Sequence, residues 1–191
     1  MYKRQFYVRQ QQPAGLGHAV WCARHLVGSE PVAVLLADDL ILGASCVKEM
    51  VDAYKGGNMV AVMDVPHEQT GSYGIVTPGA DDGRIVQVEG LVEKPDPSSA
   101  PSNIAVVGRY IITPEVFETL AAQERGAGGE IQLTDALAKQ IGKAPFSGVR
   151  FSGERFDCGS KLGFLQANVA FGLNNDAMRD QLRDWLGERL G

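Results

Sequence analysis

One apolar run constrains the fold of this chain more than any other feature. Residues 32–37, with the sequence VAVLLA, end abruptly at Asp38 and Asp39. A short continuous apolar run rich in valine and leucine is typical of a strand buried on both faces, in the parallel part of an α/β sheet. Ligands of such sheets bind beyond the carboxyl ends of the strands, so the two aspartates lie where chemistry is expected. Paired acids there favour a hard cation such as Mg²⁺, and the alternative is that one aspartate caps the next helix or turn.

The pattern on either side of this run predicts alternating strands and helices. Residues 6–9 are expected to be the end of a strand, and apolar residues at helical spacing then mark a helix that ends near Gly28. After the apolar run, a second helix is predicted around 47–54 and a short buried strand at 60–63. Strand, helix, strand, helix, strand is the order of a doubly wound α/β domain with right-handed crossovers.

A run of strand-like segments then interrupts the alternation. Residues 73–77 and 85–93 are separated by a hairpin-type connection, and 104–112 follows a loop with three prolines at 95–101. These strands are expected to pair in an antiparallel or mixed manner, and to extend the sheet or cover its ligand cleft. The rest of the chain predicts a helix opened by Thr113 as cap and Pro114, helices near 133–141, 162–173 and 178–190, and a strand near 148–152.

Composition and charge argue against several classes of function. The 191 residues carry a net charge of −5, which argues against a protein that holds nucleic acid through phosphate contacts. No apolar run reaches the roughly 20 residues that cross a bilayer, and no signal peptide is visible, so a cytoplasmic protein without a membrane partner is expected. The three cysteines, Cys22, Cys46 and Cys158, are widely spaced, which favours reduced thiols over disulfides or a zinc site.

Two further polar features are candidates for chemistry. Glu93 and Lys94 end a long predicted strand, where successive side chains point to opposite faces and could serve different parts of one ligand. A carboxylate accepts hydrogen bonds from sugar hydroxyls and an ammonium suits phosphate oxygens, although a surface strand end before Pro95 is the simpler interpretation. Asp157 is either a second metal ligand or the N-cap of the helix that begins near Lys161.

Other catalytic patterns are missing from the sequence. It contains no GxSxG elbow of a serine hydrolase, no GxxxxGK[ST] phosphate loop and no complete GxGxxG dinucleotide fingerprint. A receiver domain, which paired aspartates and a later lysine would suit, is excluded by the chain length and the predicted strand order.

An ordered set of motifs identifies a family that this chain resembles. The set comprises VRQ and GLGHAV, the apolar strand into Asp38, TGSYGIV, VEKPDPSSAPSNIAVVGRYI, GAGGEIQLTDAL and FDCGSKLGFLQA. In this order they resemble the bacterial UTP:glucose-1-phosphate uridylyltransferases of the nucleotide-sugar pyrophosphorylase superfamily, over about residues 6–186. The resemblance implies a Rossmann-like nucleotide-diphospho-sugar transferase fold with a mixed, mostly parallel sheet flanked by helices. Residues 1–5 would then be a non-native extension, 6–191 a single nucleotidyltransferase domain and 176–191 a C-terminal helix.

The resemblance also implies roles for individual residues, each at a position that matches a family motif. Those expected to be catalytic are Asp38, Lys94 and Asp157. The full set is Gln10 and the backbone of Gly15 for the uracil, Asp38 and Asp157 for Mg²⁺, Gly74 and Glu93 for glucose, Lys94 for the phosphate of glucose 1-phosphate, and Asn103 and Tyr110 as further lining of the sugar pocket. Asp39 would shape the turn or contact its neighbours.

The implied reaction joins UTP and glucose 1-phosphate into UDP-glucose and pyrophosphate, in a full-length protein expected to be a homo-oligomer, either a dimer or a tetramer. Family members begin with a strand and a glycine-rich GxGTRxxP loop, and this sequence contains neither. The 191-residue chain alone is therefore expected to be inactive or nearly so. Two alternatives remain open: a non-catalytic sugar-nucleotide-binding or regulatory protein of the same fold, and a relative that uses dTTP or ATP.

Overall fold

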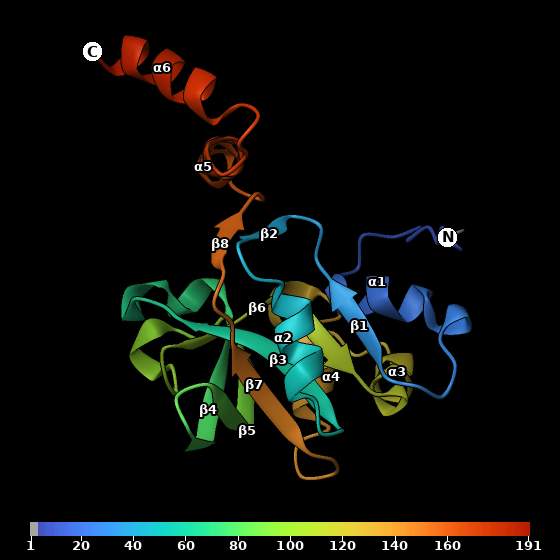
Figure 1. Ribbon diagram of the computed structural model, residues 1–191. Helices are drawn as coiled ribbons and strands as arrows, with labels where there is room; N and C mark the ends of the chain where they lie inside the picture. The colour runs from blue at the N-terminus through green and yellow to red at the C-terminus, as the bar shows by residue number, and fades with distance from the viewer. Residues whose placement is uncertain (1–3) are drawn as a thin grey trace. The chain divides into compact units, whose positions relative to one another are not determined.

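A computed structural model describes residues 4–191, and in it the chain divides into two units (Figure 1). The first unit holds the chain up to Val34 together with Val47–Phe151, and the second holds Leu35–Cys46 and Ser152–Gly191. Residues 1–3 of the expected non-native extension lie outside the described residues. That 6–191 forms one nucleotidyltransferase domain stays a prediction.

Six strands form one mixed sheet in the order β1-β6-β3-β7-β5-β4, with a further pairing between β6 and β4. β3 runs parallel to β7 and antiparallel to β6, and β5 runs antiparallel to β4 and β7. The predicted mixed sheet is confirmed, but its parallel share is smaller than expected, because strands joined by a short connection, as β4 and β5 are, pair antiparallel. The strands are β1 (Val32–Leu35), β3 (Asn58–Asp64), β4 (Gly74–Asp81), β5 (Ile85–Glu93), β6 (Ile104–Ile112) and β7 (Phe146–Arg150).

Helices cover the centre of this sheet, where every residue of β6 and the first five residues of β3 are buried. Such continuous burial without polar alternation requires cover on both faces, as the doubly wound prediction assumes. α4 (Leu133–Ala138) packs on β5 and contacts α1 (Leu16–Cys22) and α3 (Pro114–Ala121), while α2 (Cys46–Ala53) lies in front of β3 in Figure 1. Short 3-10 helices occur at Arg24–Leu26, His67–Ser72, Pro97–Ser99 and Ala127–Gly129.

The apolar run at 32–37 is shorter and more exposed than the predicted buried strand. β1 ends at Leu35, which is 52% exposed, and its residues alternate between half-buried and exposed. The reason is its place at the end of the sheet order, where β6 is its one neighbour among the described strands. A turn closed by the N–H of Asp39 and the carbonyl of Leu36 then leads into a separate strand, β2 (Asp39–Leu42).

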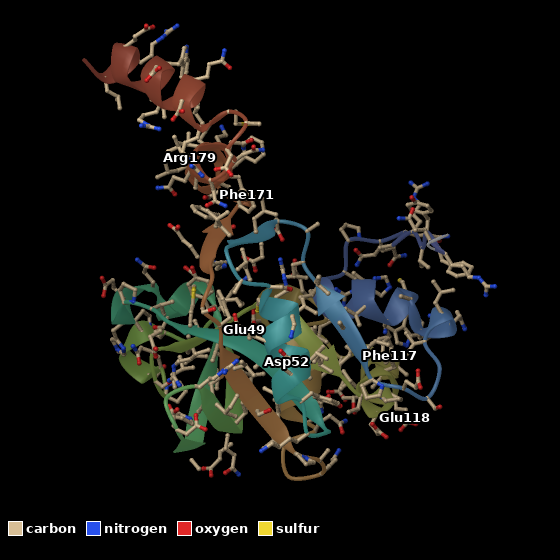
Figure 2. The ribbon with its side chains drawn as sticks, viewed as in Figure 1. Glu49, Asp52, Phe117, Glu118, Phe171 and Arg179 are labelled. Carbon is tan, nitrogen blue, oxygen red and sulfur yellow. The ribbon has the colours of Figure 1, made fainter. Side chains whose placement is uncertain are left out.

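The second unit is built on a two-stranded ribbon that the sequence does not predict. β2 pairs antiparallel with β8 (Glu154–Asp157), and α5 (Lys161–Leu173) contacts both strands. Phe171 of α5 meets Phe156 of β8 edge-on, with ring centroids 6.2 Å apart (Figure 2). The last helix, α6 (Arg179–Leu190), confirms the predicted C-terminal helix, and Arg179 donates from Nε to the carbonyl of Leu173 over 2.8 Å (Figure 2). Within residues 4–191, no helix combines the length and the hydropathy that a membrane crossing needs.

Candidate functional site

Asp38 and Asp157 come together in the second unit. Asp157 ends β8 opposite Asp39, and the N–H of Cys158 donates to the carbonyl oxygen of Asp38 over 2.8 Å. A Cβ added at Gly159 would lie 3.0 Å from Asp157 Oδ1 and 3.4 Å from Asp38 Oδ2. The two predicted metal ligands therefore border one point in space, which a side chain at position 159 would occupy.

The neighbouring Asp39 has a different partner. Its side chain is 8% exposed and its Oδ1 lies 2.5 Å from Nε of Arg155, itself 12% exposed. A buried carboxylate is tolerated when a guanidinium pairs with it, so Asp39 has a structural role as the partner of Arg155. Asp38 is exposed and the Asp157 side chain is 49% exposed, with Arg155 Nη2 at 3.9 Å from its Oδ2. Asp39 thus contacts a neighbour, as one of the two expectations for it had it, whereas the binding of a ligand by the exposed Asp38 stays a prediction.

The alternative role of Asp157, as the cap of the following helix, is excluded. The N-cap of α5 is Ser160, whose Oγ accepts from the N–H of Gly163 over 3.0 Å. Asp157 instead accepts from the N–H of Gly159 through Oδ1, over 2.9 Å. No group of three or more His, Cys, Asp or Glu suited to a metal occurs in residues 4–191, so the acids available here are a pair.

A second cluster forms in the first unit, where β4 begins and β5 ends. Gly74 pairs with Glu93 across the ladder, and a Cβ added at Gly74 would lie 3.3 Å from Glu93 Oε2 and 3.2 Å from Thr134 Oγ1. Thr134 belongs to α4, which packs on β5. The Glu93 side chain is 12% exposed, so its carboxylate lies in a largely enclosed position. Thr134 is a polar neighbour that sequence reasoning missed, although it stands within the GEIQLTD motif.

Lys94 differs from its predicted geometry. Its N–H donates to the carbonyl of Tyr73 over 2.9 Å, and its φ of 46° lies in the left-handed region, which costs a non-glycine residue about 1–2 kcal/mol. Because the backbone leaves the strand conformation at this residue, the Lys94 and Glu93 side chains do not diverge to opposite faces. Lys94 Nζ lies 3.8 Å from Glu93 Oε1 and its side chain is 53% exposed, so the ammonium and carboxylate face the same side.

Asn103 and Tyr110 are placed toward different ends of β6. Asn103 precedes the strand and donates from Nδ2 to the carbonyl of Val65 over 3.3 Å, while its backbone carbonyl accepts from the Val65 N–H over 3.0 Å. It lies at the end of β6 where Ala105 pairs with Ile75, next to Gly74 in sequence. Tyr110 is buried toward the other end of the strand, about 3.3 Å further for each intervening residue. The structure brings only Asn103 to the Gly74 end of β6, and a sugar role for either residue stays a prediction.

Gln10 and Gly15 meet at the start of α1. Nε2 of Gln10 donates to the carbonyl of Gly15 over 3.1 Å. Gly15 has a φ of 105°, and a Cβ there would lie 2.7 Å from the carbonyl oxygen of Ile131. The Ile131 N–H also donates to the carbonyl of Ala14 over 2.7 Å, so the loop lies directly against this backbone. Glycine is required for that approach, because any side chain would collide with main-chain atoms.

Two aspartates next to these clusters have shifted pKa values. Hydrogen bonds from the Ser98 side chain and N–H lower the pKa of Asp96, which caps the turn that follows Lys94. Burial raises the pKa of Asp135, which follows Thr134, and the attraction of nearby Lys139 opposes that shift. Asp96 therefore orders the proline-rich loop as an ionised acceptor, whereas Asp135 is a packed residue of α4.

Comparisons with known proteins agree on one family. A family model described as nucleotidyl transferase matches residues 3–172. UTP–glucose-1-phosphate uridylyltransferase of Komagataeibacter xylinus is 52% identical over 91% of this chain and 60% of the relative, and that of Bacillus subtilis 46% identical over 92% and 61%. The structure of a UDP-glucose pyrophosphorylase complexed with UDP-glucose has a TM-score of 0.85 at 39% identity, covering 89% of this chain and 66% of the other. The chain thus spans about 60% of the length of these curated relatives, and the resemblance drawn from its motifs is confirmed.

Proposed function

This chain belongs to the nucleotidyl transferase family, and from that premise we propose that the complete protein transfers a uridylyl group from UTP to glucose 1-phosphate. A phosphate oxygen of glucose 1-phosphate bonds to the α-phosphorus of UTP, the bond from that phosphorus to the β-phosphate bridge breaks, and pyrophosphate leaves. The names and close similarity of the relatives from Komagataeibacter xylinus and Bacillus subtilis support this donor and acceptor.

The observation that carries the proposal is the meeting of Asp38 and Asp157 at Gly159. Two carboxylates, joined by no third metal-binding acid among residues 4–191, fit Mg²⁺, which typically takes one or two protein carboxylates and fills its other positions with water and phosphate oxygens. Asp38 and Asp157 would hold the ion. When bound, Mg²⁺ supplies positive charge against the phosphate oxygens of a nucleotide.

The chain's other residues would bind and orient the substrates. Lys94 is an exposed cation that would hold the phosphate of glucose 1-phosphate, and Glu93 would accept hydrogen bonds from the glucose hydroxyls beside Gly74. Gln10 would contact the base. The attacking phosphate oxygen is already an anion, so no general base is needed. Catalysis would then rest on positioning and on neutralising the crowded phosphate charge.

Three finer expectations belong to the same proposal: Mg²⁺ as the ion, a homo-oligomeric full-length protein and a cytoplasmic location. The choice of nucleotide donor is the sharpest test of the proposed function. We expect the complete protein to use UTP with glucose 1-phosphate far better than dTTP or ATP, measured as kcat/KM for each nucleotide. A preference for dTTP or ATP, or the absence of turnover with every nucleotide, would overturn the assignment.

Replacement of Lys94 tests the acceptor side. In the complete protein, Lys94→Ala should raise KM for glucose 1-phosphate by about 10- to 100-fold, the usual cost of losing a hydrogen bond to a charged group, while KM for UTP changes little. Lys143→Ala, at an exposed lysine away from this cluster, is the matched control. Unchanged kinetics for Lys94→Ala would remove this residue from the mechanism.

A further inference from the structure

The side-chain amide of Gln10 is held by two acceptors. Its Nε2 lies 3.1 Å from the carbonyl oxygen of Gly15 and 2.9 Å from Nδ1 of His18. The Gly15 oxygen can only accept a hydrogen bond, so the amide NH₂ and not the amide oxygen must face it. This contact favours the orientation in which the amide NH₂ faces Gly15, and the contact with His18 Nδ1 favours the same orientation.

The contact between Gln10 and His18 determines which ring nitrogen of a neutral His18 carries the proton. Because the NH₂ of Gln10 has no lone pair to offer, Nδ1 of His18 must accept, and the ring proton of a neutral imidazole must then sit on Nε2. The ring is itself supported: it stacks on Trp21, with centroids 6.1 Å apart and planes 25° apart. The guanidinium of Arg24 covers Trp21, with its carbon 3.5 Å from the ring centroid.

Both N–H bonds of the Gln10 amide are therefore used, and among the described residues its Oε1 accepts no hydrogen bond. A free glutamine can offer either a donor or an acceptor, depending on how its amide is turned. A glutamine held in this way offers only an acceptor. The amide oxygen of Gln10 can accept from a base edge that presents an N–H, and it repels a base edge that presents a lone pair.

We propose that His18 is a specificity-determining positioning residue, which fixes Gln10 so that it presents only its carbonyl oxygen to the nucleobase. The inference rests on the proposed function, because that function places uracil against Gln10. Uracil carries a hydrogen on N3 and would be accepted, whereas cytosine has a lone pair on N3 and would be rejected. With His18 removed, the carbonyl of Gly15 is the one acceptor among the described residues left to hold the amide, so the Gln10 amide turns over at a lower cost and can offer its NH₂ to cytosine.

The test compares two variants of the complete protein. His18→Leu removes the acceptor and keeps apolar bulk, while His18→Asn keeps an acceptor, because its Oδ1 can replace Nδ1. We expect His18→Leu to lower the preference for UTP over CTP, as a ratio of kcat/KM values, by about tenfold, the size of one hydrogen bond in a recognition site. His18→Asn should recover most of that preference. His25→Leu, at an exposed histidine of the following turn, should change nothing.

A chemical probe covers the case in which His18→Leu does not fold. N3-methyl-UTP lacks the N3 hydrogen, and wild-type protein should use it at least about tenfold less well than UTP. A protein that prefers UTP over CTP equally well with leucine at position 18, or that uses N3-methyl-UTP as well as UTP, would overturn the role of His18 while leaving the proposed function intact. A wild-type protein that does not use UTP would instead overturn the proposed function, and this inference with it.

Discussion

At the scale of single residues, one arginine gives two adjacent aspartates different environments. Arg155 pairs with the buried Asp39 through Nε and leaves Asp38 exposed beside Asp157. The two side chains have the same chemistry and adjacent positions in the sequence, so only their partners distinguish them. Loss of either carboxylate should therefore have a different consequence.

Asparagine at each position tests this difference. Asp39→Asn leaves the largely buried Arg155 guanidinium against a neutral amide, so we expect a loss of about 3 kcal/mol in the free energy of unfolding, measured with denaturant. Asp38→Asn should change that free energy by less than about 0.5 kcal/mol, as is usual at exposed positions, yet lower turnover in the complete protein by about 100-fold. The opposite outcome, a destabilised Asp38→Asn and a stable Asp39→Asn, would contradict the assignment.

Sequence reasoning reached some residues of the candidate site and missed others for a physical reason. Asp38 and Lys94 follow strands, and polar residues at strand ends are visible in the apolar pattern. Thr134 and His18 are recognisable only through what they touch, namely the space over Gly74 and the amide of Gln10. Both stand within quoted motifs, yet nothing in their spacing distinguishes them from ordinary helical residues.

At the scale of elements, Arg150 joins three strands that are far apart in the sequence. It ends β7, contacts Asp64 of β3 through Nε at 3.1 Å, and contacts both oxygens of Asp81 in β4 at 2.9 and 3.0 Å. The hydrogen bond from Arg150, followed by one from the N–H of Gly83, lowers the pKa of Asp81 from its ordinary value of 3.8. The pairing also raises the pKa of Arg150.

This pairing predicts an acid-dependent part of stability. A carboxyl group whose pKa is lower in the folded state stabilises the fold above its unfolded pKa, near 4, and loses that contribution as the pH falls through the folded value. For each protein, the free energy of unfolding in acid is compared with its value at pH 7. As the pH drops from about 5 to about 2, the wild type should lose more of that free energy than Asp81→Asn does. Chemical denaturation across that range measures the difference.

The matched control is Asp184→Asn, at an exposed aspartate of α6. Its loss of stability with acid should follow that of the wild type. If Asp81→Asn and Asp184→Asn lose stability in parallel over the whole range, the Arg150 pairing contributes nothing to the pH dependence.

Element prediction succeeded where local pattern and tertiary environment agree. β5 and β6 have the predicted bounds, and α3 begins at Pro114 after Thr113, because alternation, continuous apolar runs and the first-turn proline are local signals. β2 and β8 have four residues each, and 116 positions separate Asp39 from Arg155. A strand of four residues can be recognised only once its pairing strand is known, and no pattern in the sequence shows that β2 and β8 pair.

At the scale of the whole molecule, the order of weak motifs carried more information than any one of them. The motifs run through both units, and the matching family model spans residues 3–172. The fold class could therefore be predicted, while the contacts that assemble each cluster could not. Those contacts depend on how distant segments pack, as at Gly159 and at Gly74.

Removal of divalent metal is the prediction that belongs to this scale. Turnover by the complete protein should fall to background with a chelator and return when Mg²⁺ is added in excess, because the proposed function assigns Asp38 and Asp157 to an ion of that kind. Asp38→Asn should need a higher Mg²⁺ concentration for half-maximal turnover, whereas Asp184→Asn should need the wild-type concentration. Full activity in the chelator would remove the metal from the mechanism.

Gly159 has a consequence for how substitutions in this protein should be interpreted. Exposed glycines usually tolerate exchange well, and Gly159 is exposed. Yet even alanine would place a methyl group 3.0 Å from one carboxylate oxygen and 3.4 Å from the other. Solvent exposure therefore does not predict tolerance to substitution at this position, so a variant found here in a survey of natural or engineered sequences should be assayed and not assumed to be a neutral surface polymorphism.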